Sequence, residues 1–167
     1  MTRLETERLV LRSARSTDLD QLHLVLSDVR AMRYWDTPAH SDITETEEFL
    51  SRMISTPIES GEEFVALLRG KVIGKVGFWR FPEIGFIVHP SFWGQGLGRE
   101  AVSAVVAHGF HTHNLPEITA DVDPRNASSI RLLEALGFVE TGRETATINV
   151  GGEWCDSIYL SRKNSRV

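Results

Sequence analysis

Residues 83–101 read EIGFIVHPSFWGQGLGREA, and this stretch decides the fold that we expect for the chain. It begins with an apolar strand over Glu83–Val88, which His89 and Pro90 end, and it continues into a helix over Glu100–Phe110. The loop between them holds three glycines, Gly94, Gly96 and Gly98. Glycines let a backbone turn sharply and approach a ligand closely, and the start of a helix offers free N–H groups and the positive end of its dipole. The stretch therefore predicts an anion-binding loop.

Two common nucleotide-binding motifs fit this loop less well. No lysine follows in the order G-K-[ST], which excludes a P-loop. Residues 96–101 satisfy the Rossmann pattern G-x-G-x-x-G/A, with Asp121 downstream. However, roughly seven residues separate the strand from these glycines, which is more than a tight βα turn uses. A Rossmann protein, recognisable by NAD binding, is a distant alternative, and a glycine-rich turn without a ligand is another.

The rest of the chain shows no linker, repeat or low-complexity tract, which predicts a single domain over residues 1–167. Hydrophobic periodicity and turn residues predict strands at 8–12, 64–68, 72–79, 83–88, 118–122, 138–150 and 153–162. Helices are expected at 17–27, 100–110 and 126–136, and another from Thr44, which forms a capping-box pattern with Glu47. Hairpins near both ends and helices between strands predict an α/β or α+β sheet with mixed strand directions.

Composition excludes several classes of protein. The chain has 167 residues, of which 41% are hydrophobic and 25% charged, as in globular domains with a core of ordinary size. No apolar run approaches the length of a membrane span, so no membrane partner is expected. The net charge of −5 argues against a nucleic-acid partner. Cys155 is the single cysteine, which excludes an internal disulfide and favours a reducing cytoplasm.

Several motifs in order resemble the GNAT superfamily of N-acetyltransferases. Its motif A, R/Q-x-x-G-x-G/A, falls on residues 93–98, with Trp93 where most members carry Arg or Gln. A W-G-x-G loop is typical of the ribosomal-protein N-terminal acetyltransferase (RimJ/RimL-like) branch. Similar to the same branch are LETERLVLR at 4–12, MRYW at 32–35 and PRNASSIRLLEALGF at 124–138. The resemblance covers nearly the whole chain.

The resemblance implies the GNAT fold, a single α/β (α+β) domain. Its central sheet is mixed and mostly antiparallel, with about seven strands, about four flanking helices and a splayed strand pair at the cofactor site. Acetyl-CoA is the implied co-substrate, held by strand backbone along its pantetheine arm and by loop amides at its pyrophosphate, and no metal is implied. The implied cofactor-binding residues are Phe86, Ile87, Val88, Trp93, Gly94, Gln95, Gly96, Leu97, Gly98, Arg99, Asn126 and Ser129.

Acetyl transfer to an amine requires a proton acceptor, a donor to the developing oxyanion and an acid for the departing thiolate. No acyl-enzyme is needed, and nothing around Cys155 indicates an activated thiol. The N–H of Val88 is the candidate oxyanion donor. By resemblance to the branch, Ser129 is the candidate general acid, although a serine without a role on a helix flank is the alternative. Asn126 is expected to cap its helix, whether or not it also contacts the cofactor.

The general base is not identified by the resemblance. The glutamate of the RimL-like branch falls near Ile148 when residues are counted from the L-G-F motif, and isoleucine takes no proton. Asp156 is our candidate for the general base, although structural pairing is the commoner explanation for such a residue. A carboxylate on an apolar strand face finds a hydrogen-bond partner or has its pKa raised. The alternatives for removing the proton are Glu144, Glu83 and a chain of water molecules without a dedicated base. The residues that share the face of Asp156 are Trp154, Ile158 and Leu160.

The acceptor is expected to be a primary amine, either a protein N-terminus or a small molecule. Tyr34, Trp35 and Glu83 are the candidate acceptor-binding residues, although the two aromatics could simply cover the core. A non-catalytic sensor that binds acyl-CoA is the alternative function, favoured by the missing glutamate of the branch. A homodimer is compatible with the sequence, which does not decide the oligomeric state.

Three histidines, His108, His111 and His113, cluster at the end of the helix that follows the loop. Catalytic zinc needs three convergent ligands. Because no cysteine or acidic cluster supports these histidines in the sequence, no metal site is expected.

Overall fold

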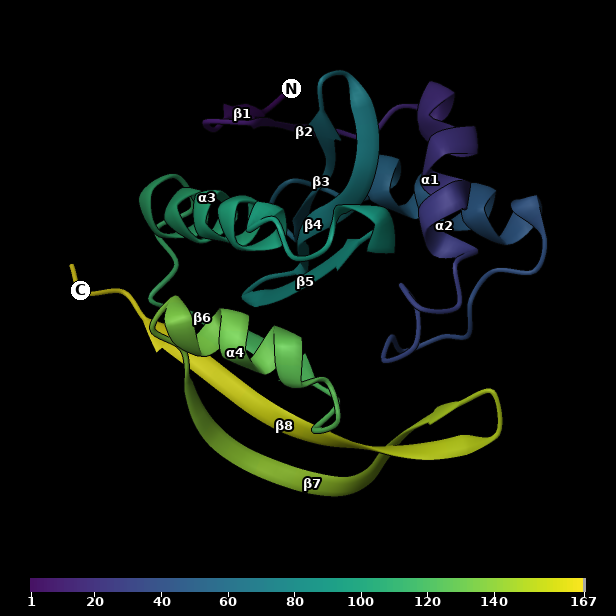
Figure 1. The fold of residues 1–167 in the computed structure, drawn as a ribbon. Coiled ribbons are helices and arrows are strands. Elements are labelled where there is room, and N and C mark those ends of the chain that lie inside the picture. Colours follow the sequence, from purple (N-terminus) through teal and green to yellow (C-terminus); the bar gives the residue numbers. More distant parts are fainter. Residues whose placement is uncertain (167) are drawn as a thin grey trace.

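The computed structural model describes residues 1–166, which form one eight-stranded sheet with four α-helices (Figure 1). The strands are β1 (Arg3–Glu5), β2 (Leu9–Ser13), β3 (Glu62–Leu68), β4 (Lys71–Arg80), β5 (Glu83–Val88), β6 (Glu117–Val122), β7 (Val139–Val150) and β8 (Glu153–Lys163). The helices are α1 (Leu19–Leu26), α2 (Ile43–Ser55), α3 (Leu97–His111) and α4 (Ala127–Ala135). None of these described helices combines the length and the hydrophobicity that crossing a membrane requires.

The strand order in the sheet is β1-β2-β3-β4-β5-β6-β8-β7. Every neighbouring pair is antiparallel except β5 and β6, which run parallel. The expected mixed, mostly antiparallel sheet is confirmed. It has eight strands instead of about seven because the short β1 pairs with β2.

The two faces of the sheet carry separate hydrophobic cores. On β3, Phe64 and Ala66 pack in the core that includes α3, whereas Val65 between them packs in the core that includes α1 and α2. This alternation follows from the pleat, because successive side chains of a strand point to opposite faces. Figure 1 shows the consequence: α3 lies on one side of strands β1–β5, and the α1–α2 pair lies on the other.

The sheet is split in its middle, between β5 and β6. These strands pair only at Glu83 and Thr119, where the Thr119 N–H donates to the Pro82 carbonyl at 3.0 Å. Beyond this point β5 stays paired with β4 as far as Val88, while β6 stays paired with β8. The parallel strands therefore diverge toward their carboxyl ends, which opens the sheet next to the start of α3 and of α4.

The starts of α2 and α3 differ from the sequence-based expectation. Helix α2 begins at Ile43 and is capped by Asp42, whose Oδ1 accepts from the Thr44 N–H at 2.8 Å. Glu45 completes this capping box by accepting from the Asp42 N–H at 3.0 Å. The sequence offers two overlapping capping patterns, and the structure uses the earlier one. Helix α3 begins at Leu97, inside the glycine-rich loop.

Gly74 keeps β4 close to the carboxyl end of β5. A Cβ atom on Gly74 would lie 2.1 Å from the Ile87 carbonyl oxygen and 3.0 Å from the Val88 Cα atom. Because both are backbone atoms of β5, Gly74→Ala is expected to lower the free energy of unfolding by about 3 kcal/mol. The matched control is Gly142→Ala on β7, whose added Cβ would meet nothing nearer than Tyr159 Cδ2 at 3.8 Å. Urea unfolding of both variants measures the difference, and equal midpoints would contradict this explanation.

Candidate active site

A cleft of about 790 Å³ occupies the split between β5 and β6. Its walls come from both diverging strands, the glycine-rich loop, the first turn of α3, one side of α4 along its length, and the segment at residues 30–35. The volume lies within the range of small-molecule and cofactor sites. The cleft thus gathers segments that are far apart in the chain around one opening in the sheet.

Eleven of the twelve expected cofactor-binding residues line this cleft, and Gln95 does not. The backbone carbonyl of Gln95 instead accepts from the Arg8 side chain at 2.8 Å. Arg8 also pairs with Glu100 on α3 at 2.7 Å. The start of the chain therefore holds the outer side of the loop, while the inner side faces the cleft. The lining residues from the expected set are Phe86, Ile87, Val88, Trp93, Gly94, Gly96, Leu97, Gly98, Arg99, Asn126 and Ser129.

The start of α3 is built to leave its first amides uncovered. The N-cap is Gly96, whose φ of 77° lies in the left-handed region that favours glycine. Glycine carries no side chain, so the cap itself provides no side-chain hydrogen bond to the first turn. Arg99 on α3 and Arg131 on α4 add two exposed cations to the lining. This end of the cleft therefore suits a phosphate group.

The backbone of β5 presents alternate amides to the cleft. The His89 N–H donates to the Ile73 carbonyl at 2.8 Å, and in antiparallel pairs the residues that bond to the partner alternate with those that do not. Since Gly74 lies opposite Val88, the Val88 N–H faces away from β4, toward the split. The Val88 carbonyl on the same side accepts from the Trp93 indole N–H at 2.7 Å. Val88 thus combines an open N–H with a carbonyl held by the loop.

Asn126 caps α4, as expected. Its Oδ1 accepts from the Ser129 N–H at 3.2 Å and from the Ser128 hydroxyl at 3.2 Å. The cap therefore uses the backbone of Ser129, and Ser129 itself is half-buried in the wall of the cleft. Ser129 and Val88 both line this cleft.

Asp121 on β6 is a lining residue that the sequence-based reasoning did not connect with catalysis. Thr119 on β6 pairs with Glu83 on β5. Asp121 and Gly85 each lie two residues further along these parallel strands, so their side-chain positions are on the same face of the sheet. Burial in the cleft raises the pKa of the Asp121 carboxyl, against a hydrogen bond from Ser157 that lowers it. Repulsion from Glu144 and Asp36 raises this pKa further. Asp121 is thus a carboxylate with raised proton affinity, and it stays accessible from the cleft.

The aromatic residues Tyr34 and Trp35 line the same cleft. Trp35 packs on Gly85, where an added Cβ would lie 3.1 Å from its ring. Gly85 therefore provides the space that lets the indole lie against β5, beside the split and on the face that carries Asp121.

A family model described as the acetyltransferase (GNAT) domain matches residues 8–139. The chain belongs to the GNAT family. It is therefore an N-acetyltransferase, and this membership favours the enzyme over the non-catalytic binding module.

Other GNAT proteins are similar along most of the chain. The uncharacterized N-acetyltransferase p20 of Bacillus licheniformis is 31% identical over 151 residues, which cover 85% of each chain. A GNAT-family acetyltransferase structure from Bacillus anthracis has 25% identity and a TM-score of 0.86, and covers 97% of this chain and 98% of that one. The ribosomal-protein-S5-alanine acetyltransferase of Vibrio fischeri has 26% identity and a TM-score of 0.84, and covers 99% of this chain and 98% of that one.

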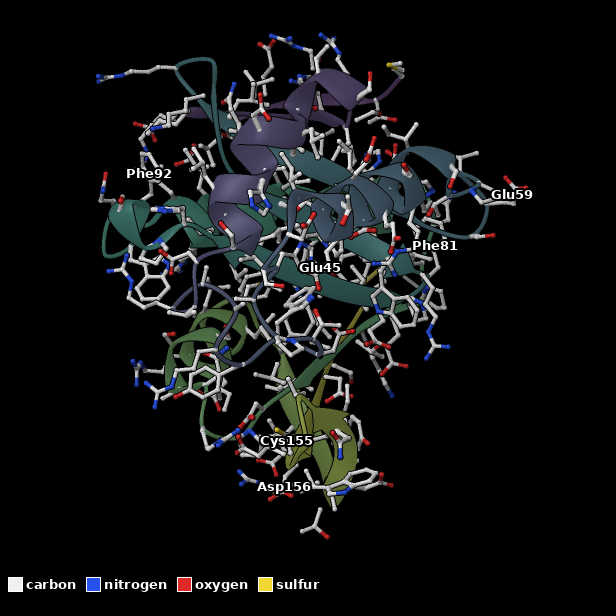
Figure 2. All side chains as sticks on the ribbon, turned by 90° about the vertical axis from the view of Figure 1, so that its right-hand side faces the viewer. Glu45, Glu59, Phe81, Phe92, Cys155 and Asp156 are labelled. Atoms are coloured by element: carbon white, nitrogen blue, oxygen red, sulfur yellow. The ribbon has the colours of Figure 1, made fainter. Side chains whose placement is uncertain are left out.

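Besides Gln95, two of the expected site residues, Glu83 and Asp156, lie outside the GNAT cleft. Glu83 sits at the closed end of the split, where β5 and β6 meet, and pairs with Arg80 at 3.6 Å. Asp156 is exposed and accepts from the Ala146 N–H at 2.8 Å. This bond holds an irregular stretch of β7 in which Ala146 has a φ of 51°. Figure 2 shows Asp156 at the opposite end of the molecule from Phe92, which lines the cleft.

The expectation that Asp156 lies on a buried apolar face is wrong. Asp156 and Trp154 are exposed, whereas Ile158 and Leu160 further along β8 are buried. The pairing with β6 starts only at Ile158, so the preceding part of β8 extends beyond the core. A partner for this carboxylate is present, and it is structural.

Proposed function

We propose that this GNAT enzyme transfers the acetyl group of acetyl-CoA to a primary amine that attacks directly within the cleft. The observation that carries the proposal is the arrangement of three features around one split: open amides at the start of α3, the open Val88 N–H, and the Asp121 carboxylate. Together they provide a phosphate site, an oxyanion donor and a proton acceptor in one continuous cavity.

The residues present fit coenzyme A. The first amides of α3 and the side chains of Arg99 and Arg131 suit its phosphates. The uncovered backbone of Phe86 and Val88 suits the amide-containing pantetheine arm, because strand edges bind extended chains through N–H and carbonyl groups. When bound, acetyl-CoA supplies the activated acetyl group as a thioester.

The side chains would then act on the amine and on the leaving group. Asp121 accepts a proton from the ammonium form of the acceptor, which frees the nitrogen lone pair. The Val88 N–H stabilises the carbonyl oxygen as it gains negative charge. Ser129 donates a proton to the departing sulfur and regains one from the attacking nitrogen, which loses its second proton as it becomes an amide, so the products are an amide and a free thiol. No acetylated enzyme is required, and Cys155 takes no part.

The surroundings of Asp121 support a cationic acceptor. Asp36 and Glu144 both act on Asp121 as negative charges, which attract an ammonium group. The Tyr34 and Trp35 rings are already in contact with cations of the protein itself. A protein N-terminus and a small amine both meet these requirements. The Vibrio fischeri relative is named for an alanine of ribosomal protein S5, which supports a protein acceptor as one of the two.

Ser129→Ala is expected to lower kcat by about 10²-fold with little change in the KM for acetyl-CoA, because it removes only the acid for the leaving thiolate. The matched control is Ser103→Ala on the exposed side of α3, which should retain the wild-type kcat. Thiol release from acetyl-CoA in the presence of an accepted amine measures both variants. Wild-type kcat in Ser129→Ala would remove Ser129 from the mechanism.

A further inference from the structure

One carboxylate and two imidazoles converge at the end of α3 that lies away from the cleft. Oε2 of Glu62, at the start of β3, lies 2.7 Å from Nε2 of His108, in the last turn of α3. The same oxygen lies 2.7 Å from Nε2 of His113, in the segment between α3 and β6. The three atoms all lie within 4.8 Å of one another. Three atoms of the kind that bind metals thus come from three separate segments to one point.

The sequence-based expectation of no metal site rested on a missing acidic partner, and that premise is wrong. Glu62 supplies the carboxylate from 46 residues before His108. The third candidate, His111, does not join the cluster, because its Nδ1 lies 3.2 Å from the Arg166 guanidinium. The site is made by packing β3 against α3, which no local spacing in the sequence reveals.

The cluster lies in a largely apolar surrounding, with one further polar contact from the Thr2 side chain to Glu62. Glu62 and His108 are buried, with 7% and 8% of their surfaces exposed. The Phe64 ring lies 5.8 Å from His108, and the Phe81 ring, labelled in Figure 2, lies 4.6 Å from His113. A buried charged network of this kind is often no more stable than apolar residues of the same size. A contribution to fold stability alone therefore explains the cluster poorly, whereas an apolar shell around polar ligands is common at metal sites.

We propose that Glu62, His108 and His113 bind a divalent transition-metal ion that prefers imidazole ligands, of which Zn²⁺ is the example. Two imidazoles and one carboxylate are a known donor set for zinc, with a water molecule in the fourth position. Tetrahedral ligands of zinc lie about 3.3 Å apart, given bonds of about 2.0 Å. The Glu62 oxygen must therefore move roughly half an ångström from each nitrogen. His113 lies outside regular structure, and its side chain is 15% exposed, which gives an ion a route from solvent.

Proton balance is simple for this site. Without an ion, the Nε2–H groups of His108 and His113 donate to the Glu62 carboxylate. A metal needs the Nε2 lone pair, so each neutral imidazole carries its proton on Nδ1 instead, and an imidazole that was charged releases one proton. Two N–H···O bonds are replaced by two metal–nitrogen bonds and one metal–oxygen bond. The bound ion would cross-link β3 to the end of α3 without touching the acetyl-transfer cleft.

The test uses the full chain, freed of metal with a chelator and then titrated with Zn²⁺ by calorimetry, and separately with Co²⁺ by absorption. The wild type is expected to bind one ion per chain, to show the visible bands of tetrahedral Co²⁺, and to gain at least about 3 °C in Tm at saturating Zn²⁺. Glu62→Gln keeps the shape of the side chain, and His113→Leu keeps an apolar contact with Phe81. Both are expected to weaken binding at least about tenfold.

The matched control is His111→Ala, which should bind Zn²⁺ as the wild type does because His111 faces Arg166. Absence of binding and of a Co²⁺ spectrum in the folded wild type would overturn the proposal. Wild-type affinity in both Glu62→Gln and His113→Leu would place the ion elsewhere and overturn it equally. None of these measurements depends on acetyl transfer, so their outcome is separate from that of the proposed function.

Discussion

Replacing Asp121 with asparagine is expected to lower kcat by about 10²- to 10⁴-fold, the usual contribution of a general base. Asparagine has nearly the same shape but cannot accept the proton of the ammonium. The acid side of the pH profile should identify the same group. Burial raises the pKa of Asp121. As the pH is lowered, wild-type activity should therefore start to fall at a pH above the ordinary aspartate pKa of about 3.9. The residual activity of Asp121→Asn should lack this limb.

Thermal stability separates this catalytic role from a structural one. A folded-state pKa that is raised means that the fold favours the protonated form of Asp121 and disfavours its charge. The contribution of Asp121 to folding stability is therefore fully present below its unfolded-state pKa, where the carboxyl is protonated. This contribution is lost as the pH rises through the folded-state pKa. Asp121→Asn should therefore equal or exceed the wild type in Tm at pH 7, with the difference vanishing in acid. A variant that loses both activity and Tm at pH 7 would indicate a structural role instead.

Gly98→Asp is expected to weaken acetyl-CoA binding by about 10²-fold or more, because a carboxylate would stand at the proposed phosphate site. Two like charges about 4 Å apart repel by about 4 kcal/mol near a protein surface, and each 1.4 kcal/mol is about tenfold in affinity. The side chain itself fits, since a Cβ on Gly98 would make ordinary contacts with Leu132 at 3.5 Å and Val88 at 3.7 Å.

Gly98→Asn is the matched control, with the same size and no charge. It should bind acetyl-CoA more tightly than Gly98→Asp, in a calorimetric titration at low salt. Gly98→Asp should nevertheless be at least as heat-stable as Gly98→Asn, because an acidic residue in the first turn of a helix contributes about 0.3–1 kcal/mol to stability. Equal acetyl-CoA affinities in the two variants would mean that the phosphates bind elsewhere.

The glycine-rich loop was predictable because its information is local. Residues 83–101 predict a strand end, a glycine-rich loop and a helix after it, and the structure places these together, with the helix starting at Leu97 instead of Glu100. The hairpin of β7 and β8 was predictable for the same reason, since Gly151 and Gly152 both adopt positive φ between two strands. Short-range turn chemistry specifies such features.

Asp121 and Glu62 were not predictable in this way. Whether the Asp121 side of β6 borders a core or a cleft depends on where β5 separates from it, and that separation involves residues more than thirty positions earlier. The pairing of Glu62 with His108 and His113 likewise needs the packing of β3 against α3. In β8 the period-two pattern was visible, but burial required the neighbouring strand, which ends before Asp156.

The most direct measurement is thiol release from acetyl-CoA by the purified chain, with and without a panel of N-terminal peptides and small amines. Direct attack within one cleft predicts release only when acetyl-CoA and an accepted amine are both present, with one acetyl group gained by that amine and none retained by the enzyme. Failure to bind acetyl-CoA, or an acetylated enzyme formed before any amine is added, would contradict it.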